Sequence, residues 1–190
     1  MKRKIFYNIS KRRGFTLIEV LVVLAITVII SAYVIVYSKT GQNQTTLYID
    51  AARVSELILR AKALAIATYD NPGAAQSCGY GVTLNYAQGT YTLFSYEPPK
   101  APASCATIST ISPVRSVAVT TLALNPVTTF ISGQPNDMYD VLFIPPNPNV
   151  LISDVSTHVV GSAPGVIYLR AKGNANTITI NVSLAGEVDF

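Results

Sequence analysis

Charged side chains are scarce in this sequence. They make up only 13% of the 190 residues, while hydrophobic residues make up 49% and the mean hydropathy is +0.37. This composition is apolar for a soluble protein, so part of the surface is expected to meet lipid or other subunits. The length allows one globular domain with an appended segment and is too short for two ordinary domains.

Motifs for catalysis and cofactor binding are also missing. The sequence has no G-x-S-x-G, H-E-x-x-H, P-loop or EF-hand pattern, which argues against the classes that these motifs define. The single histidine, His158, has no cysteine or acid at ligand spacing except Asp154, so we expect an ordinary surface or loop residue. Asp137 and Asp140 could join a calcium site, but two carboxylates are not a ligand array. We predict no enzyme, no cofactor and no metal site.

Cysteine is nearly absent, with only Cys78 and Cys105. They form no C-x-x-C pair, and nothing near them has metal-ligand spacing. In an oxidising exterior they could close a loop of about 28 residues, which would contribute roughly 3–4 kcal/mol. In a reducing compartment they would be two small buried hydrophobic residues.

Most of the positive charge lies near the N-terminus. The formal charge is +4, from 14 basic and 10 acidic residues. Six of the basic residues precede the first apolar run: Lys2, Arg3, Lys4, Lys11, Arg12 and Arg13. Without residues 1 to 14, the remaining 8 basic and 10 acidic residues give a charge of −2. No basic stripe is left for a phosphate backbone, so nucleic acid is disfavoured as a partner.

The longest apolar run covers residues 15 to 37 and contains one charged residue, Glu19. As a helix it would be about 35 Å long, enough to cross a bilayer. The basic residues before it predict a cytoplasmic N-terminus, with the chain after about residue 38 outside. The run is too long for the core of a secretory signal and no A-x-A site follows, so it should stay with the mature protein.

Glu19 is the residue that a plain anchor does not explain. A carboxylate near the bilayer centre costs roughly 2.5–3.5 kcal/mol, and less near the interface, so an acid inside the membrane indicates a function. Burial with a cation as an ion pair would offset this cost.

Residues 11 to 21, KRRGFTLIEVL, resemble the prepilin leader of type IV pilins and type II secretion pseudopilins. The resemblance implies that Gly14 is the last leader residue and that Phe15 becomes the N-methylated mature N-terminus. It also implies that Glu19 pairs with the N-terminal amine of a neighbouring subunit during assembly. The implied partners are copies of the chain, other pilins or pseudopilins, a prepilin peptidase, an ATPase and an inner-membrane assembly platform. The alternative, an uncleaved anchor, needs neither a Gly-Phe junction nor a buried acid.

The chain beyond the apolar run predicts further helix. Residues 38 to 46 are polar and include Gly41, so a loosened or bent helix is expected there. Residues 47 to 69 have apolar positions at helical spacing, with charged residues between them, which indicates an amphipathic helix. The sequence Asp-Asn-Pro-Gly at 70 to 73 should end it.

After residue 73 the pattern changes to the alternation of β-strands. Residues 80 to 84 and 90 to 96 predict a hairpin around a turn at 85 to 89. Further strands are expected at 114–122, 127–131, 138–144, 149–153, 165–170 and 176–184. The predicted fold is α+β: a long N-terminal helix, with a transmembrane half and an amphipathic half, packed on a mostly antiparallel β-sheet domain.

The predicted parts are a leader at 1–14, a transmembrane and assembly helix at 15–37, a polar joint and amphipathic helix at 38–70, and a β domain at 71–190. This layout is similar to the GspH/FimT group of minor pseudopilins. We expect a structural subunit that waits in the cytoplasmic membrane, surrounded by lipid, with its β domain outside, and then enters an extracytoplasmic filament. The alternative is a minor tip subunit that binds a secreted substrate, a surface or DNA.

Overall fold

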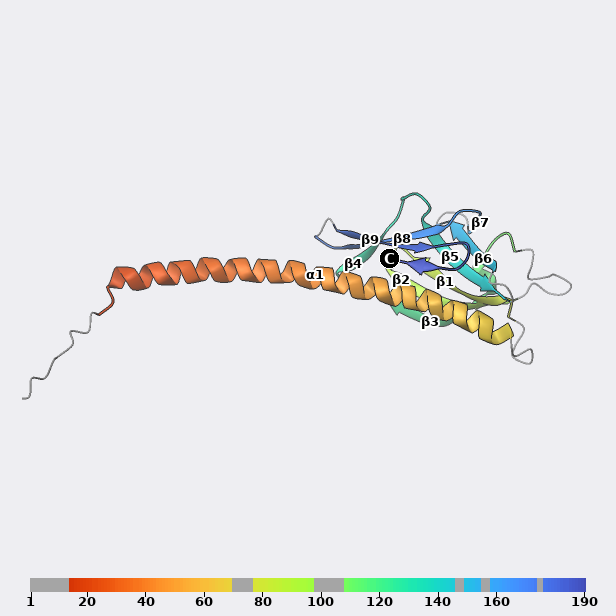
Figure 1. The fold of residues 1–190 in the computed structure, drawn as a ribbon, viewed down its shortest axis with the longest axis horizontal. Coiled ribbons are helices and arrows are strands. Elements are labelled where there is room, and N and C mark those ends of the chain that lie inside the picture. The colour runs from red at the N-terminus through yellow and green to blue at the C-terminus, as the bar shows by residue number, and fades with distance from the viewer. Residues whose placement is uncertain (1–13, 70–76, 98–107, 146–148, 155–157, 174–175) are drawn as a thin grey trace, which may run out of the picture. The chain divides into compact units, whose positions relative to one another are not determined.

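The computed structural model describes residues 14–69, 77–97, 108–145, 149–154, 158–173 and 176–190. It divides into two compact units, Met1–Thr40 and Gly41–Phe190. Figure 1 labels α1 and the strands β1 to β9; the described part of the chain has one long helix, one short 3₁₀ helix and ten strands. The predicted α+β fold is confirmed.

Helix α1 (Leu17–Tyr69) begins with a side-chain cap. The Thr16 hydroxyl accepts a hydrogen bond from the Glu19 backbone N–H at 3.3 Å. The Thr16 carbonyl accepts from the N–H groups of Glu19 at 3.1 Å and Val20 at 3.3 Å. Such bonds occupy backbone donors that the first turn of a helix leaves open. The T-x-x-E spacing is that of a capping box, a local signal that the sequence-based expectations did not include.

Residues 38 to 46 are helical, with no break in α1, so the expected loosening is not found. The hydroxyls of Thr45 and Thr46 donate to the carbonyls of Gly41 at 3.1 Å and Gln42 at 3.0 Å. These hydroxyls bond to carbonyls one turn back, which is compatible with a continuous helix, although such bonds slightly destabilise helices and often bend them. One glycine costs a helix only about 1 kcal/mol, too little to interrupt an element that continues on both sides.

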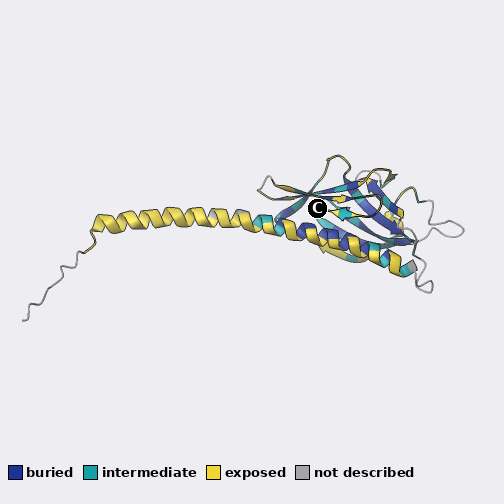
Figure 2. Ribbon diagram, viewed as in Figure 1, coloured by how far each residue is buried: buried dark blue, intermediate teal, exposed yellow. Residues whose placement is uncertain are grey.

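The second half of α1 buries one stripe of small and branched side chains. The stripe consists of Leu47, Ala51, Val54, Ile58, Ala61 and Ala65, all at most 2% exposed. Their spacing of three or four residues places them on one face of the helix. They share one core cluster with residues of both sheets, and Figure 2 shows the stripe as buried ribbon. The predicted amphipathic helix is confirmed, and it ends at Tyr69; the predicted stop at 70 to 73 lies outside the described residues.

The strands form two antiparallel sheets. The six-stranded sheet has the order β3 (Ser116–Ala123), β2 (Thr90–Tyr96), β1 (Gly79–Asn85), β5 (Met138–Ile144), β6 (Asn149–Asp154) and β7 (Val160–Gly161). The four-stranded sheet has the order β10 (Val188–Asp189), β9 (Thr177–Val182), β8 (Gly165–Ala171) and β4 (Thr128–Ile131). A short 3₁₀ helix, η2 (Pro113–Arg115), leads into β3.

All eight strands that the sequence predicts are present, with ends shifted by at most two residues. The predicted hairpin is β1 and β2, paired in register at Thr83 and Thr92, and its turn places Gly89 at a φ of 62°. The two-residue strands β7 and β10 and the division into two sheets were not predicted. Alternation identifies a strand, but it does not specify the strand's partner.

The two faces of the six-stranded sheet differ. Alternate residues such as Val82, Leu84 and Leu93 belong to the core cluster that includes α1. We call the opposite side the outer face. Part of it carries a second apolar cluster: Cys78, Phe94, Tyr96, Ile111, Leu142 and Ile144. The rest of the outer face is polar, and it contains one of the two candidate sites.

Candidate functional site

The first candidate site is the N-terminal segment that precedes and begins α1. Phe15 is 81% exposed, and a side chain built on Gly14 would meet no atom within 4 Å. The fold itself therefore accepts a larger residue at position 14. If glycine is required at position 14, the requirement must come from another protein that binds this segment of the chain. The basic leader residues 1 to 13 lie outside the described residues.

Glu19 lies in the first turn of α1, next to the cap that Thr16 provides. A negative charge in the first turn interacts favourably with the helix dipole. Glu19 is also the only charged residue between positions 15 and 37. Its position is therefore suited to two tasks, stabilisation of the helix start and pairing with a cation, and experiments must separate them.

The stretch of α1 around Glu19 is apolar on every side and has no described neighbour. Residues 14 to 35 and 37 to 39 are all exposed, as Figure 2 shows for this part of the ribbon. In the described chain, α1 is the one helix long and apolar enough to cross a membrane. A helix that is apolar all round is stable only when lipid or other helices surround it. The apolar helix fits a membrane anchor.

The second candidate site lies on the outer face of the six-stranded sheet. One row of side chains crosses five neighbouring strands in register: Thr121 on β3, Thr92 on β2, Thr83 on β1, Asp140 on β5 and Ser153 on β6. The hydroxyls of Thr92 and Thr121 lie 3.0 Å apart. Four hydroxyls and one carboxylate thus follow each other at the strand spacing of about 4.8 Å.

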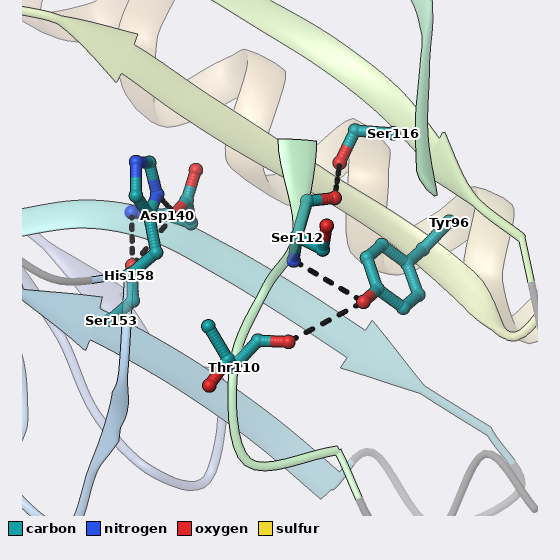
Figure 3. Close-up of polar contacts among 7 residues, drawn as sticks. All are labelled: Tyr96, Thr110, Ser112, Ser116, Asp140, Ser153 and His158. Atoms are coloured by element: carbon teal, nitrogen blue, oxygen red, sulfur yellow. Dashed lines mark hydrogen bonds and ion pairs between the residues drawn. The ribbon is translucent and has the colours of Figure 1, made fainter. Parts of the chain in front are cut away.

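Asp140 connects this row to His158. Its Oδ2 accepts a hydrogen bond from the Ser153 hydroxyl at 2.7 Å and lies 2.8 Å from Nδ1 of His158 (Figure 3). The Asp140 side chain is 4% exposed and that of His158 is 32% exposed. The contact fixes the imidazole through Nδ1 and leaves the Nε2 side of the ring outside the pair. His158 lies in a loop and is partly exposed, as expected, but the register of β5 gives it an acid partner, Asp140, that is distant in sequence.

The backbone around His158 is also fixed. His158 has a φ of 55°, a left-handed conformation that is uncommon for residues other than glycine. Its carbonyl accepts from the Ile111 N–H at 3.0 Å. The segment around Ile111 is fixed by a second set of bonds, which Figure 3 shows. The Ser112 N–H donates to the Tyr96 hydroxyl, and this hydroxyl donates to the Thr110 carbonyl.

A groove with a volume of about 430 Å³ opens over the polar row. Thr83, Thr92 and Thr121 form part of its lining, together with Ile111, Tyr139 and His158. Tyr139 stands at an irregularity in the β5–β6 pairing, where the register shifts between Met138 and Asp140. Its ring meets the imidazole of His158 edge to face, with centroids 4.5 Å apart. Bulges often redirect a side chain in this way.

The acids considered for calcium are bound to protein donors. Asp137 Oδ2 accepts from the Gln134 N–H at 2.8 Å, and Asp140 Oδ2 has the two partners described above. Among the residues that the structure describes, no group of three His, Cys, Asp or Glu could hold a metal ion. Burial raises the pKa of the Tyr86 phenol, and the nearby Asp137 carboxylate adds to the rise.

Cys78 is buried at 3% exposure, at the start of β1, and its N–H donates to the Tyr96 carbonyl at 2.7 Å. Cys105 lies outside the described residues, so the pairing of Cys78 with Cys105 stays a prediction.

Comparison with known families supports the interpretation of the first site. Residues 9–35 match the model of the prokaryotic N-terminal methylation motif, the type IV pilin and pseudopilin signature. No curated protein and no solved structure matches the chain significantly. The match covers the N-terminal segment, and the β domain lies beyond it. The chain therefore carries the signature of type IV pilins and pseudopilins, which supports a pilin-like or pseudopilin structural subunit with an apolar N-terminal anchor.

Proposed function

We propose that this chain is a subunit of a type IV pilus or of a type II secretion-like filament. The observation that carries the proposal is the combination at one helix start: a Gly14-Phe15 junction, an acid at Glu19 and an exposed apolar helix. A prepilin peptidase cleaves after Gly14, and Phe15 becomes the N-methylated end. The subunit waits in the cytoplasmic membrane with its β domain outside, until an assembly platform draws it into the filament.

Assembly replaces lipid around α1 with the helices of other subunits. Helices that are apolar all round can form such a bundle by close packing. Cleavage creates an amine at Phe15, just before α1 begins at Leu17, but this amine does not pair with Glu19 of its own chain. A neighbouring subunit, shifted along the filament, presents its amine instead. An ion pair that is buried in this way is costly to break, by roughly 3–5 kcal/mol when one partner is removed.

The structure makes a sharper test of Glu19 possible, because the residue is also part of a helix cap. Glu19→Ala removes both the charge and the capping pattern, whereas Glu19→Gln keeps the pattern and removes only the charge. Glu56→Gln is the matched control, since Glu56 is an exposed acid on the same helix. Each variant is expressed without the wild-type chain, and membranes are compared with sheared filaments.

Both Glu19 variants are expected to insert and to be cleaved but to be depleted from filaments, and Glu56→Gln should enter them normally. Incorporation of Glu19→Gln at the wild-type level would contradict the proposal, because it would show that assembly does not need the charge of Glu19.

A second role is favoured by the groove on the outer face, which a purely structural subunit does not need. In this role the chain is a minor subunit at the filament tip that recognises a secreted substrate or a surface; the groove does not favour the third alternative, DNA, because none of its described lining residues is lysine or arginine. Immunogold labelling separates the two roles: label at the tips alone supports recognition, and label along the filament supports a bulk subunit.

A further inference from the structure

We propose that the groove on the outer face binds a neutral polyhydroxylated ligand, such as a segment of an oligosaccharide chain. The ligand would lie across the row of Thr121, Thr92 and Thr83, with one end at Tyr139 and His158. This inference does not depend on the filament assignment, because it concerns the β domain alone.

The charges of the lining select against anionic ligands. Among the described residues that line the groove, none is lysine or arginine, and the only acid is Asp140. The carboxylate of Asp140 is buried and already accepts from Ser153 and contacts His158. A nucleic acid or a polyanionic glycan would bring phosphate or sulfate groups to a surface without cations to pair with them. The groove is suited to a ligand without formal charge.

The hydroxyl row matches a ligand that repeats hydroxyl groups. Each threonine hydroxyl both donates and accepts a hydrogen bond, and the bond between Thr92 and Thr121 uses only part of this capacity. The three threonines follow each other at the strand spacing of about 4.8 Å, which is close to the length of one pyranose ring. Their β-branched side chains have few rotamers, so little conformational entropy is lost on binding.

The end of the row offers a ring surface next to a fixed polar group. Tyr139 and His158 both line the groove, and their rings meet edge to face. Aromatic side chains combine a large apolar area with a polar handle, which suits the apolar face and hydroxyl edge of a sugar. Asp140 prevents the imidazole from rotating freely. A volume of about 430 Å³ lies within the range of small-ligand sites.

The test uses the full chain in micelles of a detergent without a sugar headgroup. Cellotetraose, chitotetraose and maltotetraose are titrated calorimetrically, and a heparin oligosaccharide and a short DNA duplex serve as anionic probes. At least one neutral oligosaccharide should bind, and the anionic probes should not compete with it. No heat from any neutral probe at about 10 mM would overturn the proposal, since weaker binding has no use in recognition.

Variants then locate the site. Thr92→Val and Thr121→Val keep the shape and the strand propensity of threonine and remove one hydroxyl each. Each should weaken binding about fivefold, while Thr179→Val, on the exposed face of β9, should change it less than about twofold. Tyr139→Leu should weaken binding more than Tyr139→Phe, because only leucine removes the ring. Equal binding by all of these variants would overturn the assignment of the ligand to this groove.

A measurement without any substitution completes the test. His158 is the only histidine, so its modification by diethyl pyrocarbonate can be followed without interference from other imidazoles. A saturating oligosaccharide should slow this reaction, and an unchanged rate would contradict binding beside His158.

Discussion

Helix α1 contains two stretches with opposite surroundings. Residues 17 to 35 are exposed on every side, whereas residues 47 to 65 bury a stripe against the β domain. Both stretches are regular helix, so secondary structure does not distinguish them. The distribution of apolar residues does, because an apolar stripe is covered within one chain, and an apolar cylinder needs lipid or other chains. The first stretch therefore needs lipid or other chains around it, which the monomer alone does not provide.

A matched pair of isoleucine substitutions, one in each stretch, should have very different effects on stability. Ile58 is 0% exposed and Ile26 is 51% exposed on the same helix. Ile58→Ala should lower the free energy of unfolding of the β domain by about 2–5 kcal/mol, because it leaves a cavity in the core. Ile26→Ala should change it by less than about 0.5 kcal/mol.

The measurement is urea unfolding of the full chain in micelles, followed by the near-ultraviolet signal of its 11 tyrosines. Equal destabilisation by the two variants would mean that the exposed stretch also contributes to the fold of the β domain.

The second prediction concerns the covalent support of the β domain. If Cys78 and Cys105 are bonded outside the cytoplasm, reduction should destabilise this domain by roughly 3–4 kcal/mol. Helicity of the membrane stretch should stay the same, since neither cysteine belongs to it. Two thiols that titrate in denaturant, in protein isolated without reductant, would refute the bond.

The smallest expected effect is at the cap. Thr16→Ala should cost about 1 kcal/mol of stability in the first turn, and Thr16→Ser should keep the hydrogen bond to the Glu19 N–H. The Thr16 carbonyl accepts from the Glu19 N–H in both variants, so the loss of the hydroxyl bond is measured as a higher exchange rate of the Glu19 amide proton in the alanine variant than in the serine variant. Equal amide exchange rates in the two variants would show that the Thr16 hydroxyl does not stabilise the start of α1.

Much of the fold follows from local patterns in the sequence. The alternation in β1 and β2 and the stripe on α1 identify strands and a helix, because each element shows its period within a few residues. Gly41 and its polar neighbours mislead, because their weak helix propensity cannot interrupt a helix that is favoured on both sides. The partners of β4 and β7 depend on contacts between distant parts of the chain, and no local pattern encodes them.

The two candidate sites differ in the same way. The Gly14-Phe15 junction and Glu19 form one continuous motif, so neighbouring residues in the sequence are enough to recognise it. The polar site depends on Asp140, Ser153 and His158, which the sheet register brings together over separations of 13 and 18 residues. One signal was available in the sequence: Asp140 interrupts an otherwise apolar strand, and a buried acid needs partners.

The proposed subunit requires a mature chain that begins at Phe15, two residues before the start of α1. Mass spectrometry of the N-terminal peptide of the membrane-bound chain, from cells that contain a prepilin peptidase, tests it most directly. We expect a peptide that begins with N-methylated Phe15, and an unprocessed chain when Gly14→Leu is introduced. A mature chain with another first residue, or normal processing of Gly14→Leu, would contradict it.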